Sequence, residues 1–363
     1  MKNSRNKKPF WNRVLIVLLL LLLVPVILVA GVLTFLTVTE YKPADRETMV
    51  LSGDGKQTVT VGDSISVMSW NIGYGALGDN ADFFMDGGEM VMTASEDRVR
   101  SNLEGVMKTV RKIAPDVAYF QEVDSDSKRS YHIDETALLE DLYNDDMETE
   151  ALYYSVAYVP YPVSPIGEVH TNLQTLSKFD LADATRIQLP VPFSWPVRTA
   201  NLKRCLLVSR VPLKGSDKEL VLVNLHLEAY DSGEGKVAQT KMLLDVLQSE
   251  YDKGNYVIAA GDFNQAFSNT DMSAYPSYEG MWTPGVVDVS DFAPDFTLVM
   301  DPATPTCRSL DKPLASADQD TFQYYMIDGF IVSKNLTVDA VKTIDTGFVY
   351  TDHNPVVLEA TLR

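Results

Sequence analysis

The sequence has few cysteines, and the two that it has lie far apart. Cys205 and Cys307 are the only cysteines in 363 residues, and they show no spacing typical of metal ligands. Cys205 lies in the apolar run Cys205-Leu206-Leu207-Val208, which indicates a core position. A disulfide bond between the two cysteines stays open on the sequence alone.

Basic side chains are scarce as well. Five of the 31 Lys and Arg residues lie in the first 40 positions, so residues 41–363 carry 26 basic and 49 acidic side chains, a formal net charge of −23. Such a body repels polyanions, and Lys and Arg contacts supply most non-specific affinity for nucleic acid. The composition therefore argues against a protein that tracks long nucleic acid. A small phosphate ester bound through a metal ion remains compatible with it.

Charge is absent from residues 14–39, which include six consecutive leucines. About 20 apolar residues span the hydrocarbon core of a membrane. We therefore predict an uncleaved transmembrane anchor at 14–39 in a single-pass protein of the cell membrane. The basic tail of residues 1–13 predicts a cytoplasmic N-terminus with the rest outside. A cleavable signal peptide is the alternative, although its apolar region usually has about 7–15 residues and no clean small-x-small site follows.

Internal repeats are also absent, because no stretch recurs at a fixed period. Residues 40–62 are polar and contain Pro43, Gly53 and Gly55, which predicts a tether, with a short strand possible near its end. Residues 63–363 contain no convincing linker, so we predict one domain. Apolar strand-like runs interspersed with helical patterns predict the α/β (α+β) class, in layers.

The expected elements follow from the apolar periodicity. A helix is predicted over residues 98–113, where apolar residues recur at helical spacing and Pro115 follows. Further helices are predicted at 135–143 and 239–250, and residues 268–321 are expected to be irregular. Strands are predicted at residues 65–70, 116–121, 153–159, 173–176, 186–189, 205–209, 220–227, 256–261, 325–332 and 356–362.

Polar residues of catalytic type end several of these strands. The apolar run from Tyr256 to Ala260 leads into Gly261-Asp262-Phe263-Asn264, and residues two apart on an extended chain point the same way. An Asp can activate water, and an Asn can hold a phosphoryl oxygen or that water. Ligand sites in layered sheets gather beyond strand ends. The other residues in such places are Asn71, Glu122, His226, Asp328, Asp352 and His353.

Each of these residues has a structural explanation when it is taken alone. Asn71 and Asn264 are also the type that caps turns, Glu122 could be a solvated strand end, and His226 could be a core histidine with its hydrogen bonds satisfied. Three arginines could contact an anionic substrate, because Arg suits phosphate geometry, with ion pairs inside so acidic a protein as the alternative. They are Arg129, Arg198 and Arg204.

Taken as an ordered set, the motifs resemble the endonuclease/exonuclease/phosphatase superfamily, the deoxyribonuclease-I-like fold. The resemblance runs from about residue 65 to the C-terminus, and it implies a four-layer sandwich of two β-sheets flanked by helices. It also implies hydrolysis of phosphate esters with Mg²⁺, or Mn²⁺ in its place. The motifs are Trp70-Asn71-Ile72, Gln121-Glu122-Val123, Asn224-Leu225-His226-Leu227, Gly261-Asp262-Phe263-Asn264, Ile327-Asp328 and Thr351-Asp352-His353.

The resemblance implies three residues for the metal ion. Glu122 is expected to be the principal Mg²⁺ ligand with Asn71 beside it, and Asp352 to serve a metal or a water. Oxygen ligands suit a hard cation that keeps several waters.

The resemblance implies five further residues for catalysis. Asp262 would orient or deprotonate the attacking water, and Asn264 would hold the phosphoryl group. His226 and His353 would donate hydrogen bonds to phosphoryl oxygens, and Asp328 would fix the tautomer of His353 and favour its cation.

These observations predict a membrane-anchored, Mg²⁺-dependent phosphoesterase that acts outside the cytoplasm on a small or lipid-linked phosphate ester. Two alternatives remain open at this stage. One is a metal-dependent endonuclease of the same fold, which the shortage of basic residues disfavours. The other is a catalytically inactive, membrane-tethered binding module, which the full set of site residues disfavours.

Overall fold

The computed structural model of the protein describes residues 8–142 and 146–363. Within these residues, one mixed sheet has seven strands in the order β1-β6-β7-β8-β9-β15-β12. Strands β8 and β9 run parallel and are nearly continuous apolar runs, as expected for strands that are buried on both faces. The seven strands are β1 (Arg46–Thr48), β6 (Asp183–Gln188), β7 (Cys205–Pro212), β8 (Glu219–His226), β9 (Tyr256–Asp262), β15 (Asp328–Ser333) and β12 (Phe296–Val299).

The second sheet has six strands among the described residues, in the order β16-β17-β2-β3-β5-β4. Strands β2 and β3 are parallel, so their C-terminal ends lie at the same edge. The six strands are β16 (Leu336–Thr343), β17 (Val356–Leu362), β2 (Ser64–Asn71), β3 (Val117–Asp124), β5 (Gly167–Ser177) and β4 (Met147–Val159). Two short pairs lie apart from the sheets: β10 (Gln265–Phe267) with β11 (Gly285–Val287), and β13 (Cys307–Arg308) with β14 (Tyr324–Tyr325).

Helices cover the outer faces of both sheets. Helix α2 (Glu96–Ile113) begins after Ser95, whose hydroxyl accepts a hydrogen bond from the Arg98 N–H, and ends at Ala114 in the left-handed conformation. The other helices of the domain are α3 (Glu135–Glu140), α4 (Glu234–Tyr251), and the 3-10 helices η1 (Gly73–Gly75), η2 (Phe84–Asp86), η3 (Lys128–Ser130), η4 (Val197–Ala200), η5 (Val289–Phe292), η6 (Leu314–Ser316) and η7 (Gln319–Thr321).

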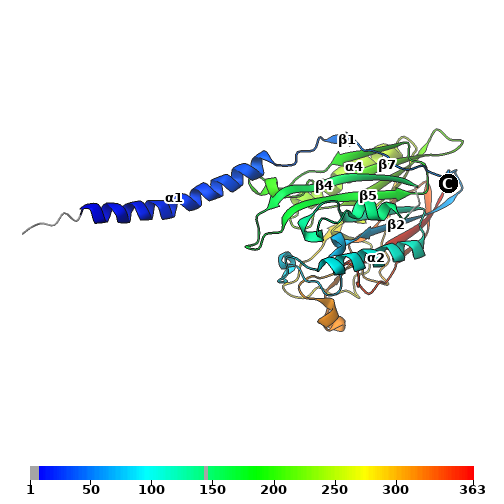
Figure 1. Cartoon of the computed structure of the whole chain (residues 1–363). Helices are drawn as coiled ribbons and strands as arrows, with labels where there is room; N and C mark the ends of the chain where they lie inside the picture. Colours follow the sequence, from blue (N-terminus) through cyan, green and yellow to red (C-terminus); the bar gives the residue numbers. More distant parts are fainter. Residues whose placement is uncertain (1–7, 143–145) are drawn as a thin grey trace, which may run out of the picture.

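The two sheets stack face to face and enclose the main core. Val67, Ile258 and Leu358 are among the fully buried side chains between the sheets. Leu103 of α2 packs on the outer face of one sheet, and Leu243 of α4 packs on the outer face of the other. The two helices therefore lie on opposite sides of the stack (Figure 1). This arrangement is the predicted four-layer sandwich of two sheets flanked by helices.

Helix α1 (Lys8–Val38) projects away from the domain (Figure 1). Its segment Phe10–Val38 is long and apolar enough to cross a membrane, and none of its most apolar window is buried. By length and composition it could serve as a membrane span or as a signal sequence. The basic side chains Lys2, Arg5 and Lys7, on which the predicted orientation rests, lie outside the described residues.

Residues 40–62, which we expected to act as a tether, lie along the domain. Strand β1 in this segment pairs with β6 at the edge of the seven-stranded sheet. Val59 forms a bridge with Leu213 and is 1% exposed. Backbone pairing therefore holds this segment against both β6 and the core, through contacts between residues far apart in the sequence.

Several boundaries differ from the sequence prediction. Residues 268–321 were expected to be irregular, but they contain β12, a four-residue edge strand too short to give a periodic signal. Strand β16 was not predicted, because polar residues interrupt its apolar pattern. Helix α3 ends at Glu140, and the predicted helix end at residue 143 lies outside the described part of the chain.

The packing between the sheets predicts the effect of a cavity there. Leu358→Ala removes a side chain that is 0% exposed and should lower the free energy of unfolding by about 2–5 kcal/mol. Val286→Ala, at a position that is 66% exposed, is the control and should change it by less than about 0.5 kcal/mol. Denaturant titration of the detergent-solubilised chain measures both. Equal effects of the two substitutions would contradict the stacked-sheet core.

Candidate active site

The predicted site residues meet at one edge of the two sheets. His226 ends β8 and pairs in register with Asp262 at the end of the parallel strand β9. Asp328 was expected near a strand end, and the structure places it at the start of β15. Because β15 runs antiparallel to β9, Asp328 also lies opposite Asp262. The seven-stranded sheet thus places these three residues side by side.

The carboxylate of Asp262 lies at the centre of the cluster. Its Oδ2 atom is 3.1 Å from Asn71 Nδ2, which comes from the other sheet. The same oxygen is 3.4 Å from His226 Nε2 and 3.7 Å from His353 Nε2. Burial raises the pKa of Asp262 to about 7, although the His353 cation opposes this shift. Three side chains that are distant in the sequence therefore converge on one oxygen of Asp262.

Glu122 joins the cluster through a local distortion of β3. Its φ angle is +56°, at a register shift between Phe120 and Val123 in the pairing of β3 with β5. Such a bulge re-aims a side chain, and Glu122 Oε1 accepts a hydrogen bond from Asn71 Nδ2 at 3.1 Å. The sequence prediction ended the strand at Glu122, whereas the structure continues β3 to Asp124.

Asn71 connects two carboxylates through its amide nitrogen. Nδ2 donates to both Glu122 and Asp262, while Oδ1 accepts the backbone N–H of Gly73 at 3.0 Å. This geometry orients the two acids. Asn71 would bind a metal ion through Oδ1, and one lone pair of this oxygen already accepts the Gly73 N–H. The role of Asn71 as a metal ligand stays a prediction.

His353 is held as a cation by Asp328. Its Nδ1 atom lies 2.9 Å from Asp328 Oδ2. Burial alone would lower the pKa of the imidazole, but the negative charge and hydrogen bond of Asp328 outweigh burial and raise the pKa well above its usual value. The Nε2–H of His353 therefore remains available toward Asp262 as part of a positively charged group.

His226 is neutral, in contrast to His353. Burial lowers the pKa of its imidazole well below the usual value, and the positive charges of Arg204 and His353 lower it further. The Tyr153 hydroxyl lies 3.1 Å from His226 Nδ1. A neutral ring that accepts this hydroxyl at Nδ1 carries its proton on Nε2, the atom that faces Asp262. No sequence pattern distinguished Tyr153, since it is one aromatic residue within a predicted strand.

Asn264 shapes the turn after β9. Its φ angle is +50°, which Asn tolerates better than most residues. Its backbone N–H donates to Asp262 Oδ1 at 2.8 Å, and its Nδ2 donates to the Leu227 carbonyl at 3.0 Å. Asn264 thus orients the Asp262 carboxylate through its backbone N–H. The contact of Asn264 with a phosphoryl group stays a prediction.

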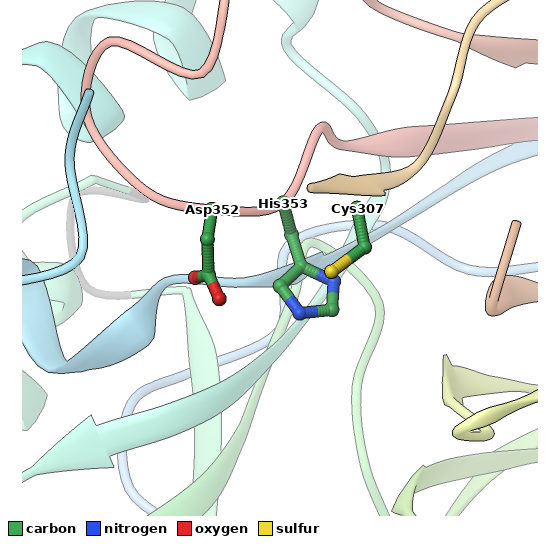
Figure 2. A group of neighbouring side chains, drawn as sticks. All are labelled: Cys307, Asp352 and His353. Atoms are coloured by element: carbon green, nitrogen blue, oxygen red, sulfur yellow. The ribbon is translucent and has the colours of Figure 1, made fainter. Parts of the chain in front are cut away.

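Asp352 and His353 come from the loop that precedes β17, and Cys307 lies beside them. Ligand-type atoms of the three residues lie within 4.8 Å of one another. In Figure 2, the Cys307 sulfur lies close to the His353 ring, and the Asp352 carboxylate lies on the other side. Burial raises the pKa of the Cys307 thiol to about 12, so it is a neutral thiol at neutral pH. Cys205 and Cys307 are both buried and free, which settles the disulfide question.

The carboxylate side of the cluster fits a hard divalent cation. Glu122, Asp262 and Asp352 line one cavity. Burial raises the pKa of Glu122, Arg129 opposes this shift, and the negative charge of Asp352 raises it further. A cation between Glu122 and Asp352 would relieve that repulsion, and carboxylate oxygens are the ligands that Mg²⁺ prefers. The neutral thiol of Cys307 does not suit such an ion.

The three arginines that we considered for substrate binding all form ion pairs. Arg129 pairs with Asp124 at 2.9 Å, Arg204 with Glu228 at 3.4 Å, and Arg198 with Glu40 at 3.0 Å. These pairs agree with the alternative expectation, that the three arginines form ion pairs inside so acidic a protein. Arg129 and Arg204 nevertheless line the cavity, so their positive charge acts on the site without a free guanidinium.

The sequence profile of the Endonuclease/Exonuclease/phosphatase family matches residues 68–353, which include the whole cluster. The chain belongs to this family. Members of the family are phosphoesterases and nucleases, which supports a hydrolase and is consistent with dependence on a divalent metal ion. No curated protein shows significant sequence similarity to the chain.

Solved structures of the endonuclease/exonuclease/phosphatase family share the fold. An endonuclease/exonuclease/phosphatase from Beutenbergia cavernae has a TM-score of 0.54 at 18% identity, over 82% of this chain and 72% of the other. The human Nocturnin catalytic domain gives 0.50 at 19%, over 87% and 98%. ANGEL2, a 2′,3′-cyclic phosphatase, gives 0.52 at 15%, over 86% and 98%. At these identities the likeness establishes the fold.

NMR can test the different charge states of His353, which we expect to be cationic, and His226, which we expect to be neutral. In the metal-free protein with ¹⁵N-labelled histidine, His353 should carry protons on both nitrogens at pH 7 and lose one only well above its usual pKa. His226 should stay neutral down to a pH well below its usual pKa. Asp328→Asn removes the charge that holds the His353 proton, so the pKa of His353 should fall. Two histidines that both titrate near 6.5 would contradict this assignment.

Proposed function

We propose that the protein is a membrane-anchored, Mg²⁺-dependent phosphoesterase that hydrolyses a phosphate ester outside the cytoplasm, with Mn²⁺ as a possible substitute ion. The convergence of two imidazole Nε2 atoms and one amide on Asp262, beside Glu122 and Asp352, carries this proposal. Two neighbours hold related anions: Nocturnin was solved with bound sulfate and ANGEL2 with adenosine-2′,3′-vanadate.

Glu122 and Asp352 would hold the metal ion, with Asn71 beside them. When bound, the ion supplies Lewis acidity toward the phosphoryl oxygens and helps to orient the ester. The remaining chemistry belongs to the side chains of the chain itself.

Asp262 would act as the general base. A carboxylate with a pKa of about 7 can accept a proton from water near neutral pH. The water oxygen attacks phosphorus as its proton passes to Asp262, and the ester P–O bond breaks. The leaving alkoxide takes up a proton from solvent, to which Asp262 returns the proton that it accepted. The His353 cation and the neutral His226 N–H face the space beside Asp262, where they can donate to phosphoryl oxygens as negative charge develops.

The charge of the domain favours a small or lipid-linked ester over long nucleic acid. Residues 41–363 have a formal net charge of −23. Of the arginines that line the cavity, Arg129 and Arg204 are paired with Asp124 and Glu228, and Arg308 donates hydrogen bonds to backbone carbonyls. Non-specific DNA binding depends on unpaired cations along a surface. Nicking of plasmid DNA with steep salt dependence would favour the nuclease alternative.

A substrate panel tests the proposed function. The full chain should hydrolyse members of a panel of phosphomonoesters and phosphodiesters with Mg²⁺, and a chelator should abolish the activity. Asp262→Asn and His353→Ala should each lower kcat by about 10²–10⁴-fold, as expected for loss of an acid or base.

Matched substitutions control for indirect effects. His132→Ala, at a side chain that is 54% exposed, and Asp217→Asn, at one that is 86% exposed, should leave kcat unchanged. Unchanged rates in both Asp262→Asn and His353→Ala would contradict the proposed function.

The pKa of Asp262 predicts how the rate depends on pH. A general base acts when deprotonated, so kcat/KM should rise with pH as Asp262 loses its proton near 7. Higher Mg²⁺ should move this limb to lower pH, because a cation favours the carboxylate. Asp86 lines the same cavity, and burial raises its pKa to about 6. The rise of kcat/KM with pH should persist in the control Asp86→Asn. Its loss in that variant would assign the titration to Asp86 and contradict the role of Asp262.

A further inference from the structure

The active-site cavity extends from the catalytic cluster to the end of α1. It has a volume of about 710 Å³, and its lining includes His226 and Asp262 as well as Leu33 and Leu36 of α1. A phosphate group needs only a small part of this volume, since one water occupies about 30 Å³. Most of the cavity is therefore available to another part of the substrate.

Apolar and aromatic side chains form the wall of the cavity between Asp262 and the end of α1. Leu36 is buried and packs with Val159 and Ile166 of the β4–β5 hairpin. Phe84 of η2 lies across from Tyr161 of the same hairpin, with 5.4 Å between the ring centroids. All five residues line the cavity or its mouth. A wall of this kind suits a hydrocarbon chain, which offers no hydrogen bonds.

The end of α1 is fixed on the domain beside this wall. The Glu40 carboxylate is 2% exposed and pairs with Arg198 at 3.0 Å and Lys203 at 3.6 Å. The Trp195 indole N–H donates to the Thr37 hydroxyl at 3.1 Å. Figure 1 shows α1 meeting the domain near β4. If α1 spans a bilayer, these contacts hold the apolar end of the cavity at the membrane surface.

Exposed apolar residues surround the same place. Tyr161 is 63% exposed and Val163 is fully exposed at the tip of the β4–β5 hairpin. Trp195 and Val197, in the segment that contacts the end of α1, are 54% and 57% exposed. Trp and Tyr prefer the interface between membrane and water, where an apolar ring and a polar group are both satisfied. This surface is suited to contact with lipid headgroups.

We propose that the substrate is an amphiphilic phosphate ester of the membrane, whose hydrocarbon chain enters between α1 and the β4–β5 hairpin while its phosphate reaches Asp262. The proposal rests on the proposed phosphoesterase function and narrows its substrate. The continuity of the cavity from Leu33 to Asp262 carries it. A water-soluble ester with an aromatic group stacked in the cavity is the competing occupant that the experiments below distinguish.

Hydrolysis of a matched pair of esters is the first test. The full chain is reconstituted in vesicles of digalactosyl diacylglycerol, a lipid without phosphate, with Mg²⁺. Hexadecyl 4-nitrophenyl phosphate and methyl 4-nitrophenyl phosphate release the same product. We expect kcat/KM to be at least about 10-fold higher for the hexadecyl ester, because each buried methylene favours binding. Tyr161→Ser should reduce this preference, by lowering kcat/KM for the hexadecyl ester more than for the methyl ester.

The control is Tyr278→Ser, at an exposed tyrosine that does not line the cavity within the described structure. It should leave the preference unchanged, so concentration of the hexadecyl ester on the vesicle surface cannot account for an effect of Tyr161→Ser. Equal kcat/KM for the two esters in the wild type, with hydrolysis of both, would overturn the inference and leave the proposed function standing.

Photolabelling tests the chain site without catalysis. The probe is a hexadecylphosphonate with a diazirine at the chain end, whose C–P bond is not an ester. In the same vesicles it should label residues of the inner wall such as Tyr154, Ile166 and Leu36. An excess of methylphosphonate, which lacks the long chain, should not abolish this labelling. Labels confined to the exposed face of α1 between Leu15 and Leu28 would overturn the inference. Wall labelling without hydrolysis of any ester would support the chain site and refute the proposed function.

Discussion

The burial of one carboxylate between two sheets is the constraint on which the site depends. Asp262 is 2% exposed, and an isolated charge in such a place is strongly disfavoured. The nearby Nε2 atoms of His226 and His353 and the amide of Asn71 supply the compensation. Because these groups come from both sheets, the geometry of the cluster requires that the two sheets stack in one register.

The surroundings of each ring then set the charge of each histidine. Asp328 binds Nδ1 of His353 and keeps that ring cationic, whereas the Tyr153 hydroxyl faces Nδ1 of His226 and burial keeps that ring neutral. Two residues of the same type therefore have different charges within one cluster. In the proposed mechanism, this difference would allow one ring to stabilise developing negative charge while the other adds no further positive charge to a confined space.

The attachment of α1 links the site to its surroundings. Ion pairs of Glu40 and the packing of Leu36 hold the helix end against η4 and β4, on the side where the cavity is apolar. A helix that only tethered the domain would need no such contacts. The cavity that holds Asp262 thus reaches Leu33 and Leu36 of this helix, and the position of the helix end follows from contacts outside the cluster around Asp262.

The sequence by itself determined the order of the strands that carry Asn71, Glu122, His226 and Asp262, the apolar helix and the family, because apolar runs and the residues that end them are local features. Tertiary structure alone decided that β12 completes a sheet, that Tyr153 and Cys307 lie beside the histidines, and that residues 40–62 pair with the domain. These features depend on contacts between residues far apart in the chain. No local pattern encodes such contacts, so the shape of the cavity and the charge of each histidine emerged only from the folded arrangement.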